Sequence, residues 1–147
     1  MGPRLLVDGY NVVHAWDDLK TLMSASLEQA RDRLVGRLSV YSHISGWAVT
    51  VVFDAHLTSG NPGSREVRDG VEVVFTRSGS TADHAVERMA YEARERGEAL
   101  TAATSDRFHA DMLRGMGAGV IDALELRRRV EDAEGEMTRR LRTYGAT

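Results

Sequence analysis

The sequence has 147 residues but no cysteine, only two prolines and a single lysine, Lys20. The absence of cysteine excludes disulfides, thiol nucleophiles and zinc sites with thiolate ligands. The sequence also lacks an apolar run of about 18 residues and has no apolar segment of signal-peptide length at its N-terminus. We therefore expect a cytoplasmic protein that makes no membrane contact.

The length and the 42% content of hydrophobic residues fit one globular domain over residues 1–147. The net charge of −3 argues against a protein that coats nucleic acid nonspecifically, because such binding requires many phosphates to be neutralised. Local basic patches are compatible with this charge. Residues 127–142 are rich in arginine but also carry acidic residues, and this mixture is typical of a solvated helix face.

Apolar runs of strand length alternate with segments of helical periodicity. This order predicts an α/β fold in three layers, with helices on both faces of a mostly parallel sheet of about five strands. We interpret Val12–Ala25 as an irregular connection and Ala55–Gly70 as an exposed, mobile loop, and the direction of strand 71–76 stays open. The expected strands are residues 4–7, 47–53, 71–76, 99–104 and 119–121, and the expected helices are 26–46, 81–97, 106–116 and 122–141.

Aspartates follow three of these strands, at Asp8, Asp54 and Asp106, and Asp83 lies in the first turn of a helix. Capping of the next helix is an alternative role for Asp83 and Asp106, but it does not explain Asp8 and Asp54, which precede expected loops. In parallel sheets the carboxyl ends of strands meet at one edge, where ligands bind.

Converging carboxylates repel one another by about 4 kcal/mol per pair at a separation of about 4 Å. Such a cluster either takes up protons or holds hard divalent cations, and oxygen ligands favour Mg²⁺ or Mn²⁺. These ions generate hydroxide and stabilise the charge that develops on a phosphodiester under attack. The amide of Asn11, one turn beyond Asp8, would orient a carboxylate or water without adding charge.

Three other aspartate chemistries do not fit. A receiver domain needs a lysine after a late strand, and Lys20 comes too early. A haloacid-dehalogenase-type phosphatase needs a second aspartate at the position of Tyr10. A dinucleotide site needs a glycine-rich first turn, whereas this turn has one glycine and a carboxylate, so we expect no dinucleotide cofactor.

The histidines show less pattern. His56 follows Asp54 closely and would border the site, and His84 adjoins Asp83. We interpret His14, His43 and His109 as surface or packing residues.

Five segments together resemble the NYN domain, and specifically its bacterial YacP-like branch. They are Leu5–Asn11 (LLVDGYN), Val51–His56 (VVFDAH), Val71–Thr76 (VEVVFT), Thr81–Asp83 (TAD) and Ala103–Asp106 (ATSD). The resemblance implies a fold like that of PIN-type nucleases and an acidic cluster that binds one or two Mg²⁺ or Mn²⁺ ions for endoribonuclease cleavage. By this resemblance Asp8 and Asp83 are the central metal-binding pair, Asp54 and Asp106 complete the cluster, and Asn11 supports it.

The leading hypothesis is therefore a metal-dependent endoribonuclease with Asp8, Asp83, Asn11 and Asp106 as catalytic residues. The resemblance further implies mRNA as substrate and association with the ribosome. Two alternatives stay open: a noncatalytic RNA- or ribosome-binding module of the same fold, and a metal-dependent phosphatase acting on small phosphoesters. The residues expected to contact RNA are His56, Arg65, Arg68, Arg77 and Arg107.

Overall fold

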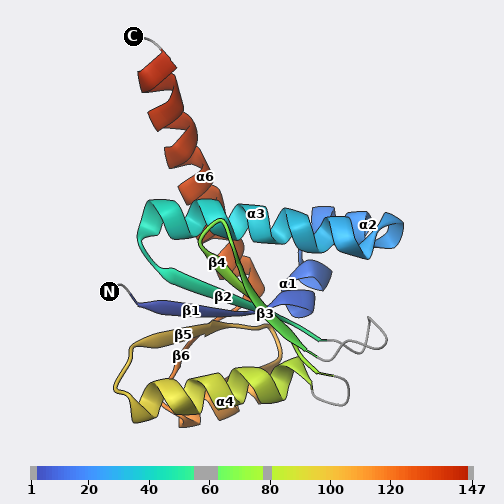
Figure 1. Ribbon diagram of the computed structural model, residues 1–147, viewed down its shortest axis with the longest axis vertical. Helices are drawn as coiled ribbons and strands as arrows, with labels where there is room; N and C mark the ends of the chain where they lie inside the picture. Colours follow the sequence, from blue (N-terminus) through green and yellow to red (C-terminus); the bar gives the residue numbers. More distant parts are fainter. Residues whose placement is uncertain (1–2, 55–62, 78–80, 146–147) are drawn as a thin grey trace.

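The computed structural model describes residues 3–54, 63–77 and 81–145. Its centre is a six-stranded sheet with the strand order β3-β4-β2-β1-β5-β6 (Figure 1). Neighbouring strands are parallel except β3, which is antiparallel to β4. The mostly parallel sheet is thus confirmed, with one strand more than expected. The strands are β1 Arg4–Asp8, β2 Ala48–Phe53, β3 Ser64–Arg68, β4 Val71–Phe75, β5 Leu100–Ala103 and β6 Gly119–Ile121.

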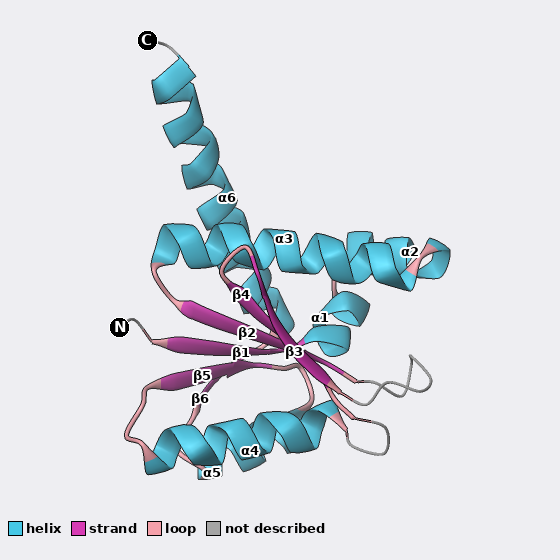
Figure 2. Ribbon diagram, in the orientation of Figure 1, coloured by secondary structure: helices cyan, strands magenta, loops and turns pink. Residues whose placement is uncertain are grey.

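Helices cover both faces of the sheet, which confirms the three layers (Figure 2). Side chains alternate along a strand, so Leu5 and Val7 of β1 pack against the first helix layer and Leu6 packs against the second. The first layer contains α1 Gly9–Ala15, α2 Asp17–Ala25, α3 Leu27–Ser45 and α6 Ala123–Gly145; the second contains α4 Ala82–Glu95 and α5 Arg107–Gly115.

The expected irregular connection over Val12–Ala25 is wrong, because this segment forms most of α1 and all of α2. Its apolar residues Val12, Val13, Trp16 and Leu19 do have helical spacing, and all four are buried. Trp16 is extended and divides the segment into two short helices, and its indole N–H donates to the Ala123 carbonyl oxygen at 2.8 Å. Two helices of this length are hard to recognise from periodicity.

The expected loop over Ala55–Gly70 is also partly wrong, because Ser64–Arg68 is strand β3. Within the described ranges this strand pairs only with β4, and it is almost fully exposed, so its sequence needs no apolar face. Residues 55–62 lie outside the described residues. Strand β4 is parallel to β2 and lies inside the sheet, which settles the direction that the sequence left open.

Strand β1 lies at the point where the order of strands reverses. It pairs with β2 on one side and β5 on the other, and α4 carries the chain from β4 across to β5. At such a switch point the loops beyond the carboxyl ends of the strands diverge and leave room for a ligand. Asp8 is the last residue of this central strand.

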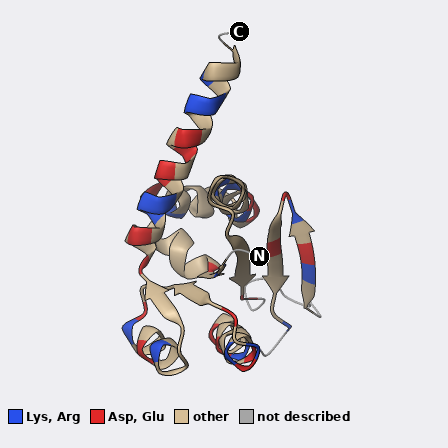
Figure 3. Ribbon diagram, turned by 90° about the vertical axis from the view of Figure 1, so that its left-hand side faces the viewer, with Lys and Arg blue, Asp and Glu red and all other residues tan. Residues whose placement is uncertain are grey.

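Helix α6 continues well beyond the sheet (Figure 1). Its buried residues all lie between Ala123 and Ala133, and acidic and basic residues follow one another along the rest of the helix (Figure 3). Glu136 is paired with Arg139 and Arg140, so a solvated helix face is confirmed there. Among the described residues, no helix is long and apolar enough to cross a membrane.

Candidate metal centre

The first residue of the site is Asp8, whose position depends on the glycine that follows it. Asp8 is the N-cap residue of α1, yet its side chain makes no capping hydrogen bond with the described part of the chain. A Cβ added at Gly9 would lie 2.4 Å from Cε1 of Phe53, so only glycine allows the backbone to pass this ring. The carboxylate is thus held at the end of β1.

The second residue, Asp83, lies in the first turn of α4. Thr81 caps this helix, because its hydroxyl oxygen accepts from the backbone N–H of His84 at 3.2 Å. Oδ2 of Asp54 accepts from the backbone N–H of Ala82 at 3.4 Å and so joins the end of β2 to the same helix terminus. Capping therefore does not explain Asp83, and its side chain is half exposed.

The third residue is His109, which the sequence analysis interpreted as a surface or packing residue. One potential ligand atom from each of Asp8, Asp83 and His109 lies within 4.8 Å of the others. The Nδ1 atom of His109 is 3.5 Å from Oδ1 of Asp83, and its Nε2 atom is 3.7 Å from Oε1 of Glu87. The imidazole is only 3% exposed, and neither ring nitrogen has a hydrogen-bond partner within the described ranges.

The electrostatics of the site are visible in the pKa of Asp8, which is raised from 3.8 to about 6. Burial is the largest cause, and the negative charge of Asp83 is the next. Asp106 raises the pKa further, whereas His109 and the backbone N–H of Asn11 lower it. The cluster therefore carries the carboxylate repulsion that was expected, and a bound cation would relieve it.

Asp106 has a different role from Asp83, because its Oδ1 accepts from the backbone N–H of His109 at 3.1 Å and caps α5. Asn11 is tied to the same loop: its Oδ1 accepts from the backbone N–H of Ser105 at 2.8 Å. The Ser105 hydroxyl oxygen in turn accepts from the N–H of Ala123 at 3.1 Å. Asn11 thus holds the loop between β5 and α5 next to Asp8.

The structure brings together some of the predicted site residues and not others. Asp8 and Asp83 belong to the group of converging ligand atoms, whereas Asp54 and Asp106 lie at the same edge but outside that group. The predicted role of Asp54 and Asp106 as metal ligands stays a prediction.

The predicted RNA-binding arginines are spread over the molecule. Arg68 stands opposite Val71, the first residue of β4, and therefore lies at the amino ends of the parallel strands, away from Asp8. Its guanidinium group forms ion pairs with Asp32 and Glu66. Arg65, also on β3, lies 3.7 Å from Glu72. Arg77 is exposed beyond the carboxyl end of β4, and Arg107 is exposed in the first turn of α5. His56 lies outside the described residues.

Sequence patterns did not indicate His109 or Glu87 as site residues. Each has a weak signal: Glu87 is four residues after Asp83, which places both on one face of α4, and His109 is three residues after the cap Asp106. Neither spacing shows that the two helices bring these side chains together.

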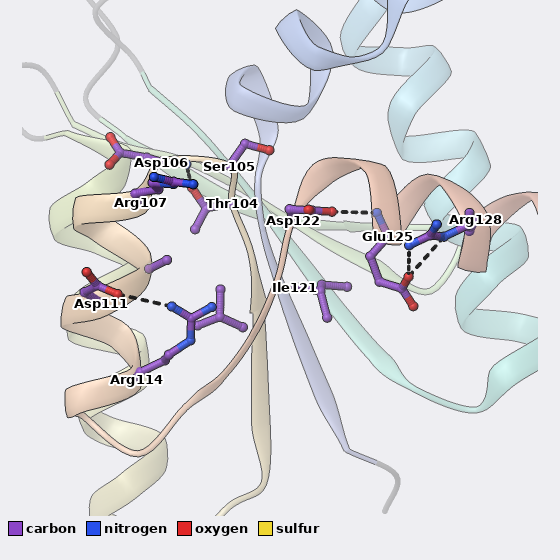
Figure 4. A pocket seen from close by; sticks show the side chains of 12 residues that line it. Thr104, Ser105, Asp106, Arg107, Asp111, Arg114, Ile121, Asp122, Glu125 and Arg128 are labelled. Atoms are coloured by element: carbon purple, nitrogen blue, oxygen red, sulfur yellow. Dashed lines mark hydrogen bonds and ion pairs between the residues drawn. The ribbon is translucent and has the colours of Figure 1, made fainter.

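A groove of about 710 Å³ lies between α5, β6 and the start of α6 (Figure 4). Asp106 and Arg107 line it next to the loop between β5 and α5. Farther along, Arg114 is paired with Asp111 at 3.2 Å and Arg128 with Glu125 at 2.6 Å. In the first turn of α5, Arg107 carries a positive charge beside the acidic site.

The fold and the site together define an α/β protein with a candidate divalent-metal centre, built from two carboxylates and an imidazole at the switch point of its sheet. The donor set suits such an ion, because carboxylate oxygens and a buried, unbonded imidazole are metal ligands. The comparisons with known proteins identify the family. The YacP-like NYN domain matches residues 5–146, and the chain belongs to this family.

The relatives found are close. The chain is 41% identical over 138 residues to protein YacP of Bacillus subtilis (strain 168), and the alignment covers 94% of this chain and 81% of that protein. Two crystal structures of Rae1 (YacP) from Bacillus subtilis superimpose with a TM-score of 0.84. One, a single-residue mutant, is 38% identical and is matched over 98% of this chain and 84% of its own; the other is 39% identical, over 99% and 83%. These matches confirm the resemblance and the fold class inferred from the sequence.

Proposed function

We propose that this protein is a metal-dependent endoribonuclease that hydrolyses RNA phosphodiesters. The observation that carries the proposal is the convergence of Asp8, Asp83 and His109 at the carboxyl edge of an NYN domain, a fold that suggests a nuclease. A Mg²⁺ or Mn²⁺ ion bound there would activate water and stabilise the negative charge on the phosphodiester.

The residues of this chain have separate tasks in the proposed reaction. Asp8 and Asp83 hold the ion, and Asp54 and Asp106 add negative charge around it. Asn11 holds the loop before α5 close to the end of β1, because its side-chain oxygen accepts a hydrogen bond from the backbone N–H of Ser105. Since the group is half open on the Asp83 side, a phosphate of the substrate can approach from the solvent.

The direct test is RNA cleavage by the full chain with Mn²⁺ and with EDTA. Asp83→Asn should lower the cleavage rate by more than about 100-fold, because it removes the charge of a metal ligand and leaves Thr81 in place as the cap of α4. Glu92→Gln is the matched control, since it removes a carboxylate from an exposed position of the same helix. Undiminished Mn²⁺-dependent cleavage by Asp83→Asn would contradict the proposal.

The same experiment distinguishes the two alternatives that the sequence left open. A noncatalytic RNA-binding module would bind the RNA and leave it uncut with any ion. A phosphatase would release phosphate from a chromogenic monoester and leave the RNA uncut.

We further propose that the RNA strand follows the groove between α5 and α6 and that Arg107 contacts a phosphate. Arg114 and Arg128 already bond carboxylates, whereas Arg107 is exposed and lines the groove beside Asp106. Arg107→Ala should weaken RNA binding uniformly across sequences and reduce the slope of log K against log salt by about one. Arg96→Ala, at the other end of α4, is the control. An unchanged slope for Arg107→Ala would exclude this path.

The cellular setting is proposed on the family resemblance: a cytoplasmic enzyme that acts on mRNA and associates with the ribosome. Cosedimentation of the full chain with ribosomes at physiological salt would test that association separately from cleavage.

A further inference from the structure

The imidazole of His109 is held between two carboxylates of one helix. Asp83 and Glu87 are four residues apart in α4, so their side chains leave the same face of that helix. The ring arrives from α5, with Nδ1 3.5 Å from Asp83 Oδ1 and Nε2 3.7 Å from Glu87 Oε1. Each nitrogen therefore faces a different acidic residue.

The ring is buried although neither nitrogen forms a hydrogen bond within the described part of the chain. Buried polar atoms without partners are rare in folded proteins, and each one calls for a ligand or a function. Asp83 lies on the Nδ1 side of the ring, and one ligand atom from each of Asp8, Asp83 and His109 lies within 4.8 Å of the others. The Nδ1 atom is thus aimed at the place where the proposed function puts a cation.

We infer that His109 binds the ion through Nδ1 and that Glu87 is a positioning residue that accepts a hydrogen bond from Nε2–H. The inference rests on the metal centre of the proposed function. Metal-binding histidines usually donate their other N–H to a carboxylate or carbonyl, which fixes the tautomer and the orientation of the ring. Glu87 is the group that faces this N–H, and its side chain is mostly buried.

A nitrogen ligand makes the site selective between divalent ions. Mg²⁺ prefers oxygen ligands, whereas Mn²⁺ and the later transition ions accept imidazole more readily. The structure thus assigns to His109 a preference for Mn²⁺ over Mg²⁺ that four carboxylates alone would not give.

A competing arrangement leaves the metal out: a protonated His109 would pair with Asp83 and Glu87 and neutralise them. The two arrangements differ in one observable, the contact between the ring nitrogen and the ion. Pulsed EPR of Mn²⁺ bound to the untagged full chain detects a ¹⁴N nucleus in the ligand shell and requires no variant.

The expected result is a ¹⁴N coupling that His109→Gln removes and that His84→Gln, a change at an exposed neighbour of Asp83, leaves in place. Glu87→Gln should keep the ¹⁴N coupling but lower Mn²⁺ affinity by about 10-fold to 100-fold, because a neutral amide oxygen replaces the charged acceptor of Nε2–H. The same variant should change Mg²⁺ affinity less. Glu92→Gln should change neither affinity.

Bound Mn²⁺ without a ¹⁴N coupling would overturn the inference, as would the absence of Mn²⁺ binding. These outcomes are separable from the failure of the proposed function. A ¹⁴N coupling in a protein that leaves RNA uncut would support His109 as a metal ligand and contradict the nuclease function. Mn²⁺-dependent cleavage without the coupling would support the nuclease function and contradict His109 as a ligand.

Discussion

The amino-terminal ends of α4 and α5 both open on the site, and each carries an aspartate, but the two aspartates have different roles. In α4 the hydroxyl of Thr81 caps the helix, and Asp83 joins the acidic group. In α5 the carboxylate of Asp106 is itself the cap. The difference shows that a carboxylate at a helix terminus is available to a metal when a neighbouring side chain does the capping.

The largest expected effect concerns Mn²⁺ affinity at these two termini. Asp83→Asn should weaken Mn²⁺ binding by more than about 100-fold, whereas Asp106→Asn, which keeps a good cap, should weaken it by less than about 10-fold. Isothermal titration calorimetry measures both. Equal losses would show that Asp106 binds the ion directly, as the sequence analysis predicted, and would remove the distinction between the termini.

Asp8, at the end of β1, is influenced by the aspartates of both termini and has a pKa of about 6. A carboxyl whose pKa is raised on folding destabilises the metal-free protein as pH rises from about 4 to about 6, because the folded state holds the proton more tightly. The loss is on the order of 2–3 kcal/mol. Asp8→Asn should remove it.

The measurement is urea unfolding in EDTA at pH 4 and pH 7. The free energy of unfolding of Asp8→Asn should exceed that of the unmodified chain at pH 7, and the difference should shrink toward pH 4. With Mn²⁺ the order at pH 7 should reverse, since only the unmodified chain binds the ion well. A difference that does not depend on pH would contradict the raised pKa.

The smallest expected effect is the loss of folding stability when a helix cap is removed. Asp106→Ala and Thr81→Ala should each lower the free energy of unfolding by about 1 kcal/mol, because each leaves a helix N–H without its acceptor. Asp106→Asn and Thr81→Ser are the matched controls and should stay within about 0.5 kcal/mol of the unmodified chain. If Thr81→Ala costs nothing, another group caps α4 and the contrast with α5 has a different origin.

Much of this fold follows from local sequence patterns. The helices expected over 26–46 and 122–141 both start at a capping side chain. The hydroxyl oxygen of Ser26 accepts from the N–H of Gln29 before α3, and Oδ1 of Asp122 accepts from the N–H of Glu125 before α6. Strand β3 was missed because an exposed edge strand needs no apolar alternation.

The candidate site was only partly predictable. Asp8 and Asp83 could be expected at one edge because the ends of parallel strands and the starts of the following helices share that edge. His109 could not, because its burial and its contacts with Asp83 and Glu87 arise from the packing of α5 against α4. Sequence alone also left open whether Asp83 would cap α4.

The close approach of Gly9 to Phe53 connects the backbone next to Asp8 with the backbone next to Asp54. The centroid of the Phe53 ring is 5.5 Å from that of Phe75 and 5.1 Å from that of Tyr10. Phe53 directly precedes Asp54 in the chain. The Phe53 ring therefore limits how closely the backbone at Gly9, beside Asp8, can approach the end of β2, beside Asp54. An apolar side chain in this way constrains the backbone positions of two acidic residues.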